Sequence, residues 1–137
     1  MNADILIDVK GLYKLYNNGA LHALDGVDTE IHRGEVVVVI GPSGSGKSTF
    51  LRCLNLLELP TLGTITFEGV DITDAKVNIN IHRQKMGMVF QHFNLFPNMT
   101  VEENITLAPV TLKLKSKREA EEIAMQLLKR IGLADKA

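Results

Sequence analysis

Cysteine is almost absent from this sequence: Cys53 stands alone among 137 residues. A single cysteine excludes a disulfide framework and a paired CxxC metal or redox site, which fits a reducing compartment such as the cytosol. Cys53 falls in a segment predicted to be helical, where a small buried hydrophobe is far commoner than a nucleophile. We therefore assign Cys53 no chemical role.

An excess of charge and a long hydrophobic run are lacking as well. Fifteen Lys and Arg oppose sixteen Asp and Glu, a net charge of -1, so no overall field attracts nucleic acid or an anionic membrane. The strongest apolar run, Val36 to Ile40, is too short to span a bilayer, and the N-terminus is acidic at Asp4 rather than basic and then apolar. We expect no nucleic-acid partner, no membrane span and no signal peptide.

The histidines and one run of basic residues carry no recognisable site. His22, His32, His82 and His92 have no metal-ligand spacing, and we expect all four to be solvated. The run from Lys113 to Arg118 is interpreted as a solvated linker, with a lipid-headgroup contact as the alternative.

Hydrophobic periodicity predicts strands in the first part of the chain. Since 45% of the residues are hydrophobic, one compact globular unit is favoured. Alternation at Ile5, Ile7 and Val9 predicts a strand, and residues 23–31, with a turn at Asp25-Gly26, predict a second one that leads to the Arg33-Gly34 turn. The β-branched run 35–40 has the pattern of a central strand buried on both faces, and 86–90 that of another buried strand.

Helices are predicted to alternate with further strands. Apolar spacing indicates a helix over 48–57, and a short helix is expected over 78–85, where the periodicity is weak. Two short strands flank the Glu68-Gly69 turn at 63–67 and 69–72. Capping-box patterns at 100–103 and 116–119 predict the starts of two more helices, and Gly132 the end of the second. This order indicates an α/β layered domain with an N-terminal antiparallel β portion.

Between the run 35–40 and the helix 48–57 lies a complete P-loop. Its residues are Gly41, Pro42, Ser43, Gly44, Ser45, Gly46, Lys47 and Ser48. The three glycines let the backbone turn so that successive amides converge on phosphate oxygens. Lys47 places its charge on the β- and γ-phosphates, Ser48 offers a hydroxyl to Mg²⁺, and Thr49 adds an α-phosphate contact near the helix N-terminus. The motif predicts that the chain binds ATP with Mg²⁺.

Six segments together extend the pattern well beyond the P-loop. They are residues 12–16, 21–27, 34–36, the P-loop itself, 51–55 and 88–97. In these segments the chain resembles the N-terminal part of an ATP-binding subunit of an ABC importer of the polar amino acid uptake type. The resemblance covers essentially all 137 residues. It implies a partial ABC-type nucleotide-binding domain over 1–137, with an α/β P-loop NTPase core truncated before the helical subdomain signature.

The resemblance also implies roles for single residues. Tyr16 matches the aromatic that stacks on adenine, whereas Tyr13 has the wrong place in the pattern. Gln91 matches the Q-loop glutamine, which reaches Mg²⁺ or the attacking water. Lys47 and Gln91 are thus the catalytic candidates, and Ser48 and Gln91 the metal ligands.

The loop after Gln91 is implied to lie against membrane subunits. Phe93, Leu95 and Phe96 would be unusual on a free surface, and in the family this region borders the groove that receives a permease helix. The alternative is that these side chains pack under their own loop.

The function implied is that of an ATPase subunit that drives amino acid import. It would be peripheral to the cytoplasmic face of the plasma membrane, with transmembrane permease subunits and a second copy of itself as partners. The family's signature motif, Walker B strand and switch histidine normally lie beyond residue 137, so we expect this chain alone to be inactive. A soluble P-loop kinase or GTPase and a non-transport ABC ATPase stay open as alternatives.

Overall fold

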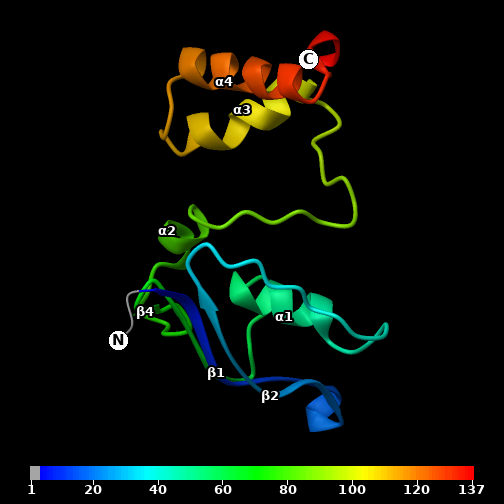
Figure 1. Ribbon diagram of the computed structural model, residues 1–137, viewed down its shortest axis with the longest axis vertical. Helices are drawn as coiled ribbons and strands as arrows, with labels where there is room; N and C mark the ends of the chain where they lie inside the picture. The colour runs from blue at the N-terminus through cyan, green and yellow to red at the C-terminus, as the bar shows by residue number, and fades with distance from the viewer. Residues whose placement is uncertain (1–3) are drawn as a thin grey trace. The chain divides into compact units, whose positions relative to one another are not determined.

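Antiparallel strands form the sheet of the computed structural model, which describes residues 4–137 (Figure 1). The strands are β1 (Ile5–Tyr16), β2 (Leu21–His32), β3 (Leu62–Phe67) and β4 (Val70–Asp71), in the order β2-β1-β3-β4. The 3-10 turn η1 (Asn17–Gly19) joins β1 to β2. The four strands predicted in these regions are confirmed.

The predicted turn at Asp25-Gly26 is instead an irregularity inside β2. Leu12 of β1 pairs with Val27, but Tyr13 pairs with Asp25, so one extra residue of β2 is accommodated there. That residue, Gly26, has a φ of 77°. Glycine adopts this conformation without steric cost, which is typical of a β-bulge.

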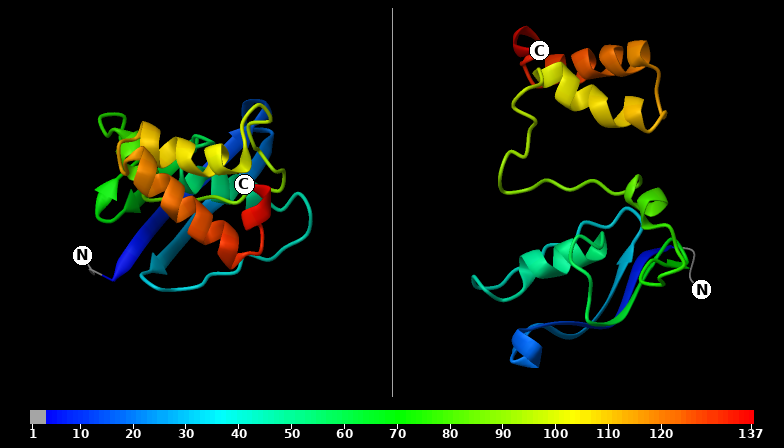
Figure 2. Two further views of the ribbon diagram at one scale, coloured as in Figure 1. Left: turned by 90° about the horizontal axis from the view of Figure 1, so that it is seen from above. Right: turned by 180° about the vertical axis from the view of Figure 1, so that it is seen from behind.

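One face of the sheet is covered by α1 (Lys47–Leu54), as the views in Figure 2 also show. The helix ends three residues earlier than the predicted 57. The core under it consists of Val9, Leu12, Leu24, Cys53, Leu56, Ile65, Phe67 and Ile72. Burial raises the pKa of the Cys53 thiol, which agrees with a packing role and no reactivity.

The predicted helix near residue 80 is α2 (Ile79–Arg83). Asn78 caps it by accepting the Asn80 amide at 3.1 Å. Arg83 donates to the carbonyl oxygens of Asn55 and Leu56 at 2.9 and 3.0 Å, just after α1. These bonds satisfy acceptors at a helix end and hold α2 in place.

Two predicted strands do not form. Residues 35–40 and 86–90 have no strand conformation, and Val36 and Val89 are 89% and 98% exposed. Within residues 4–137 the four strands pair only with one another. A strand is stable when a neighbour takes up its backbone hydrogen bonds. The prediction of buried strands is therefore wrong for these two runs, because no strand within residues 4–137 pairs with either of them.

Three of the four histidines are solvated as expected, and His82 is not. The side chains of His22 and His32 are 48% and 43% exposed, and His92 is exposed too. His82 lies edge-on to Phe67, with ring centroids 6.3 Å apart, because α2 places it beside β3. Among residues 4–137, no group of three or more His, Cys, Asp or Glu is placed to hold a metal ion.

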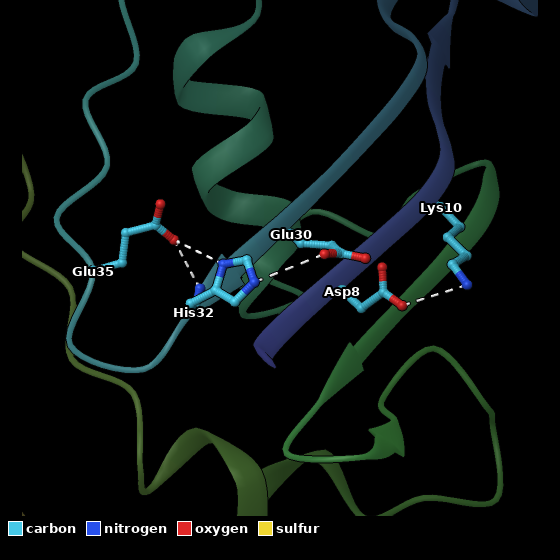
Figure 3. A network of polar contacts seen from close by, with 5 residues as sticks. All are labelled: Asp8, Lys10, Glu30, His32 and Glu35. Atoms are coloured by element: carbon cyan, nitrogen blue, oxygen red, sulfur yellow. Dashed lines mark hydrogen bonds and ion pairs between the residues drawn. The ribbon is translucent and has the colours of Figure 1, made fainter. Parts of the chain in front are cut away.

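The end of β2 carries an exposed polar network, which Figure 3 shows. The His32 ring lies between two carboxylates, with Nδ1 3.4 Å from Glu35 and Nε2 3.9 Å from Glu30. The backbone amide of His32 donates to Glu35 at 2.8 Å, which lowers the pKa of that carboxyl. Asp8 and Lys10 on β1 form a separate pair at 3.5 Å. Exposed pairs contribute about 0–1 kcal/mol, so this network mainly orients the turn.

The contacts divide the chain after Met88, and the second unit covers Val89–Ala137. The composition favoured one compact unit, but contacts gather within the sheet region and within a helix pair. That pair is α3 (Val101–Thr111) and α4 (Lys117–Arg130), followed by η2 (Ala134–Lys136).

The predicted helix boundaries in the second unit are confirmed. Thr100 accepts the Glu103 amide at 3.0 Å while the Glu103 carboxylate accepts the Thr100 amide at 2.8 Å, a complete capping box. Ser116 caps α4 by accepting the Glu119 amide at 3.2 Å. Gly132 follows α4 with a φ of 76°, the left-handed conformation that commonly ends a helix.

Candidate nucleotide-binding site

The P-loop residues form a loop over 41–46 that leads into α1 at Lys47. Gly46 is the N-cap of this helix, with a φ of 96°. A Cβ atom at Gly46 would lie 2.3 Å from the carbonyl oxygen of Ala23 on β2. Glycine is therefore required here both by the backbone conformation and by the close approach to β2.

The loop itself is a tight turn. The Ser45 amide donates to the Pro42 carbonyl at 3.1 Å, and Gly44 has a φ of 81°. A Cβ atom at Gly41 would come within 2.8 Å of Ser45 Oγ. The first amides of α1 have no partner within the helix, and its dipole is positive at this end. A loop that a Cβ would obstruct, facing a helix N-terminus, fits a bound phosphate group.

Lys47 holds its ammonium group over the loop. Its Nζ donates to the carbonyl oxygens of Gly41 and Pro42 at 2.5 and 2.9 Å, and lies 3.3 Å from Ser45 Oγ. The positive charge is thus placed at the turn where the loop and the helix meet. An anion bound to the loop amides would lie beside this charge, which is the geometry for phosphate oxygens.

Next to the loop is a cavity of about 310 Å³. It separates β2 from the extended segment that precedes the P-loop. Its lining consists of Leu24, Val27, Thr29, Ile31, Val37, Val39, Ile40, Ser45, Gly46, Lys47 and Phe50. The lining is apolar apart from Thr29 and the end at the P-loop, and an apolar wall strengthens the electrostatic attraction between Lys47 and an anion.

Tyr16 lies at the end of β1, outside the set of residues that line this cavity. Figures 1 and 2 show the tip of the β1–β2 hairpin and the P-loop at the same end of the first unit. The Lys14 ammonium lies 5.1 Å from the centre of the Tyr16 ring. The Tyr13 hydroxyl lies against Gly26 of β2 instead.

The remaining predicted site residues fall in both units. Ser48 and Thr49 occupy the first turn of α1, and Gln91 is exposed in the second unit. The sharing of one metal ion by Ser48 and Gln91 stays a prediction.

The loop that follows Gln91 is open to solvent. Phe93 is 94% exposed, and Leu95 and Phe96 are 61% and 53% exposed. The alternative in which these side chains pack under their own loop is therefore wrong.

Sequence reasoning missed two residues that organise these regions. Lys14 contacts the Tyr16 ring, and the signal available was its position two residues earlier on the same strand face. Asn104 accepts the Phe96 amide at 2.8 Å and donates to the Thr100 carbonyl at 2.8 Å. The signal was an asparagine inside the first turns of a predicted helix, since Asn favours side chain to backbone bonds over helix interiors.

A glycine loop that presents a lysine at a helix N-terminus is the site of a P-loop nucleotide-binding protein, and comparisons define the class further. Residues 24–137 match the ABC transporter family. The arginine transport ATP-binding protein ArtM of Bacillus subtilis is 54% identical over 131 residues, which cover 96% of this chain and 54% of ArtM. The glutamate/glutamine/aspartate/asparagine transport ATP-binding protein BztD of Rhodobacter capsulatus is 46% identical over 134 residues, or 98% of this chain and 50% of BztD.

A solved structure leads to the same class. The dimeric ATP-binding cassette MJ0796, in a post-hydrolysis state bound to ADP and Pi, matches with a TM-score of 0.78 and 36% identity over 90% of this chain and 56% of that one. The chain belongs to the ABC transporter family. Its predicted fold class, an α/β P-loop NTPase core with an N-terminal antiparallel β portion, is confirmed. The chain spans about half the length of the curated relatives it matches.

Proposed function

We propose that this chain is the ATP-binding part of an ABC importer subunit that couples ATP binding and hydrolysis to amino acid uptake. The observation that carries the proposal is the Lys47 ammonium over a glycine loop at the start of α1. The names of relatives that serve arginine and glutamate transport support the class of cargo. Residues 1–137 would form one partial ABC-type nucleotide-binding domain.

In this proposal each P-loop residue acts on the phosphates of ATP. Lys47 leaves the Gly41 and Pro42 carbonyls to neutralise the β- and γ-phosphates, while the first amides of α1 bind phosphate oxygens. Mg²⁺, held by Ser48 and Gln91, would supply further neutralisation of charge on the phosphates. Tyr16 would stack on the adenine ring.

The partners proposed are transmembrane permease subunits and a second copy of the subunit. Phe93, Leu95 and Phe96 support a permease contact, because exposed apolar clusters mark interaction sites. In residues 4–137 no helix has the length and the apolar character needed to cross a membrane. We propose a peripheral position at the cytoplasmic face of the plasma membrane.

The two alternative functions are less well supported. Membership of the ABC transporter family sets aside a soluble kinase or GTPase. A non-transport ABC ATPase finds no support in the relatives above, whose names refer to amino acid transport.

The proposal is tested by titrating the chain with a fluorescent ATP analogue. We expect Lys47→Ala to weaken binding by about ten- to hundredfold, since a hydrogen bond to a charged group contributes roughly 1.5–3 kcal/mol. Lys76→Ala, which removes an exposed lysine from a loop of the same unit, is the matched control and should bind as the unchanged chain does. Equal affinities for the Lys47→Ala and Lys76→Ala variants would rule out the phosphate site.

A further inference from the structure

Lys14 and Tyr16 project from the same face of β1, because they are two residues apart on a strand. The Lys14 Nζ lies over the Tyr16 ring, 5.1 Å from its centre. A cation within about 6 Å of a ring centre is attracted by the electron density of the ring face. The ammonium group therefore covers one face of Tyr16 and restrains the rotation of its ring.

Lys14 is itself held firmly. Its side chain is only 16% exposed, and Nζ donates to the Leu59 carbonyl at 2.8 Å and lies 3.5 Å from the Glu58 carboxylate. Glu58 and Leu59 belong to the segment between α1 and β3. Thr61 of that segment bonds to β1 on both sides of Lys14, to the Tyr13 carbonyl at 2.7 Å and the Leu15 amide at 3.0 Å. The segment of residues 58–61 thus holds the ammonium group in place beside β1.

We propose that Lys14 is a positioning residue for nucleotide binding, which holds the Tyr16 ring so that its second face receives the purine base. The inference rests on the proposed function, in which Tyr16 stacks on adenine. A ring already held in its binding orientation loses less conformational freedom when the base arrives, so affinity rises without a new contact to the nucleotide. Lys14 would act on the nucleotide only through Tyr16, without touching it, so its effect would be confined to the base.

The segment that holds Lys14, residues 58–61, follows shortly after the P-loop helix α1 in the chain. α1 begins at Lys47, and the Glu58 amide donates to the carbonyl of Arg52 in its last turn at 3.2 Å. One continuous segment therefore presents the phosphate-binding lysine at its start and anchors Lys14 at its end. This connection fixes the base-stacking ring relative to the loop that binds the phosphates.

The test compares the dissociation constants of ATP and of inorganic tripolyphosphate, which has no base. For Lys14→Met we expect ATP to bind about two- to fivefold more weakly, which corresponds to the lower end of the range for cation–π contacts, while tripolyphosphate binding is unchanged. Lys14→Arg keeps the charge over the ring and should restore ATP affinity. Tyr16→Ala should abolish the advantage of ATP over tripolyphosphate.

A spectroscopic readout follows the ring itself. The chain has two tyrosines and no tryptophan, so in a Tyr13→Phe background the intrinsic fluorescence reports Tyr16 alone. We expect ATP to quench this emission, and Lys14→Met to shift the quenching curve to higher ATP concentration. If Lys14→Met fails to fold by circular dichroism, Glu58→Gln keeps the lysine but removes one of its anchors, and should give the same loss for ATP alone.

Three results would overturn the inference. The first is wild-type ATP affinity in Lys14→Met, and the second is an equal loss for ATP and tripolyphosphate, which indicates general damage. The third is an unchanged ATP advantage in Tyr16→Ala, which removes the adenine contact from the proposed function as well. A loss in Tyr16→Ala with none in Lys14→Met would reject only the role of Lys14.

Discussion

At the scale of single residues, Gly46 combines two constraints that can be separated by experiment. Gly46 and Gly19 have similar φ values, 96° and 90°, but only at Gly46 would a Cβ meet a backbone atom, the Ala23 oxygen at 2.3 Å. Alanine in this conformation costs roughly 1–3 kcal/mol. We expect Gly19→Ala to show that loss in urea unfolding, and Gly46→Ala to lose clearly more because α1 must move away from β2. Equal losses would mean that the contact with Ala23 relaxes freely.

How far single residues could be predicted depends on where their partners lie in the sequence. The roles of the P-loop residues follow from a motif in which loop, lysine and helix start are adjacent, and the glycine conformations agree with it. Lys14 could not be predicted to contact Leu59, because 45 residues separate them. A strand pattern shows that Lys14 and Tyr16 share a face, but not what restrains them.

At the scale of elements, helices were easier to predict than strands, because the partners that form a helix start are close in sequence and those that form a sheet are distant. The starts of α3 and α4 were predictable, since Thr100 and Ser116 find their partners three residues away. The runs 35–40 and 86–90 were not, because a strand depends on a partner that the run itself does not contain. The hydrophobicity of such a run indicates that it can be buried. Whether it forms a buried strand depends on a neighbouring strand that takes up its backbone hydrogen bonds.

The loop before α3 gives a test at this scale. Asn104 bonds to both backbone groups of Phe96 and to the carbonyls of Met99 and Thr100. We expect Asn104→Ala to speed hydrogen exchange of the Phe96 amide by about fivefold, since its acceptor is lost and a hydrogen bond contributes about 1 kcal/mol. Thr106→Ala is the control, because its hydroxyl donates within the helix to Glu103. Similar exchange in both variants would show that Asn104 does not hold the loop.

At the scale of the whole molecule, exposed apolar residues favour association between copies of the chain, and electrostatic repulsion opposes it only weakly. Val36 and Val38 are both more than three-quarters exposed, while Val37 and Val39 line the cavity beside β2, as does one side of the exposed Ile40. The segment is therefore extended, with a free backbone edge and an apolar outer row, which favours pairing with another chain. A net charge of -1 provides little repulsion against such contact.

We therefore expect the chain of 137 residues to bind ATP weakly, to self-associate and to hydrolyse ATP at a rate near background. Within residues 4–137, the cavity at Lys47 has no carboxylate in its lining to orient a water molecule, and positioning and charge stabilisation carry most of phosphoryl-transfer catalysis. Static light scattering should show oligomers at micromolar concentration, and Val38→Glu, which places a charge in the outer row, should reduce their mass. Phosphate release should match that of Lys47→Ala. A monodisperse monomer with Mg²⁺-dependent phosphate release well above this control would contradict the prediction.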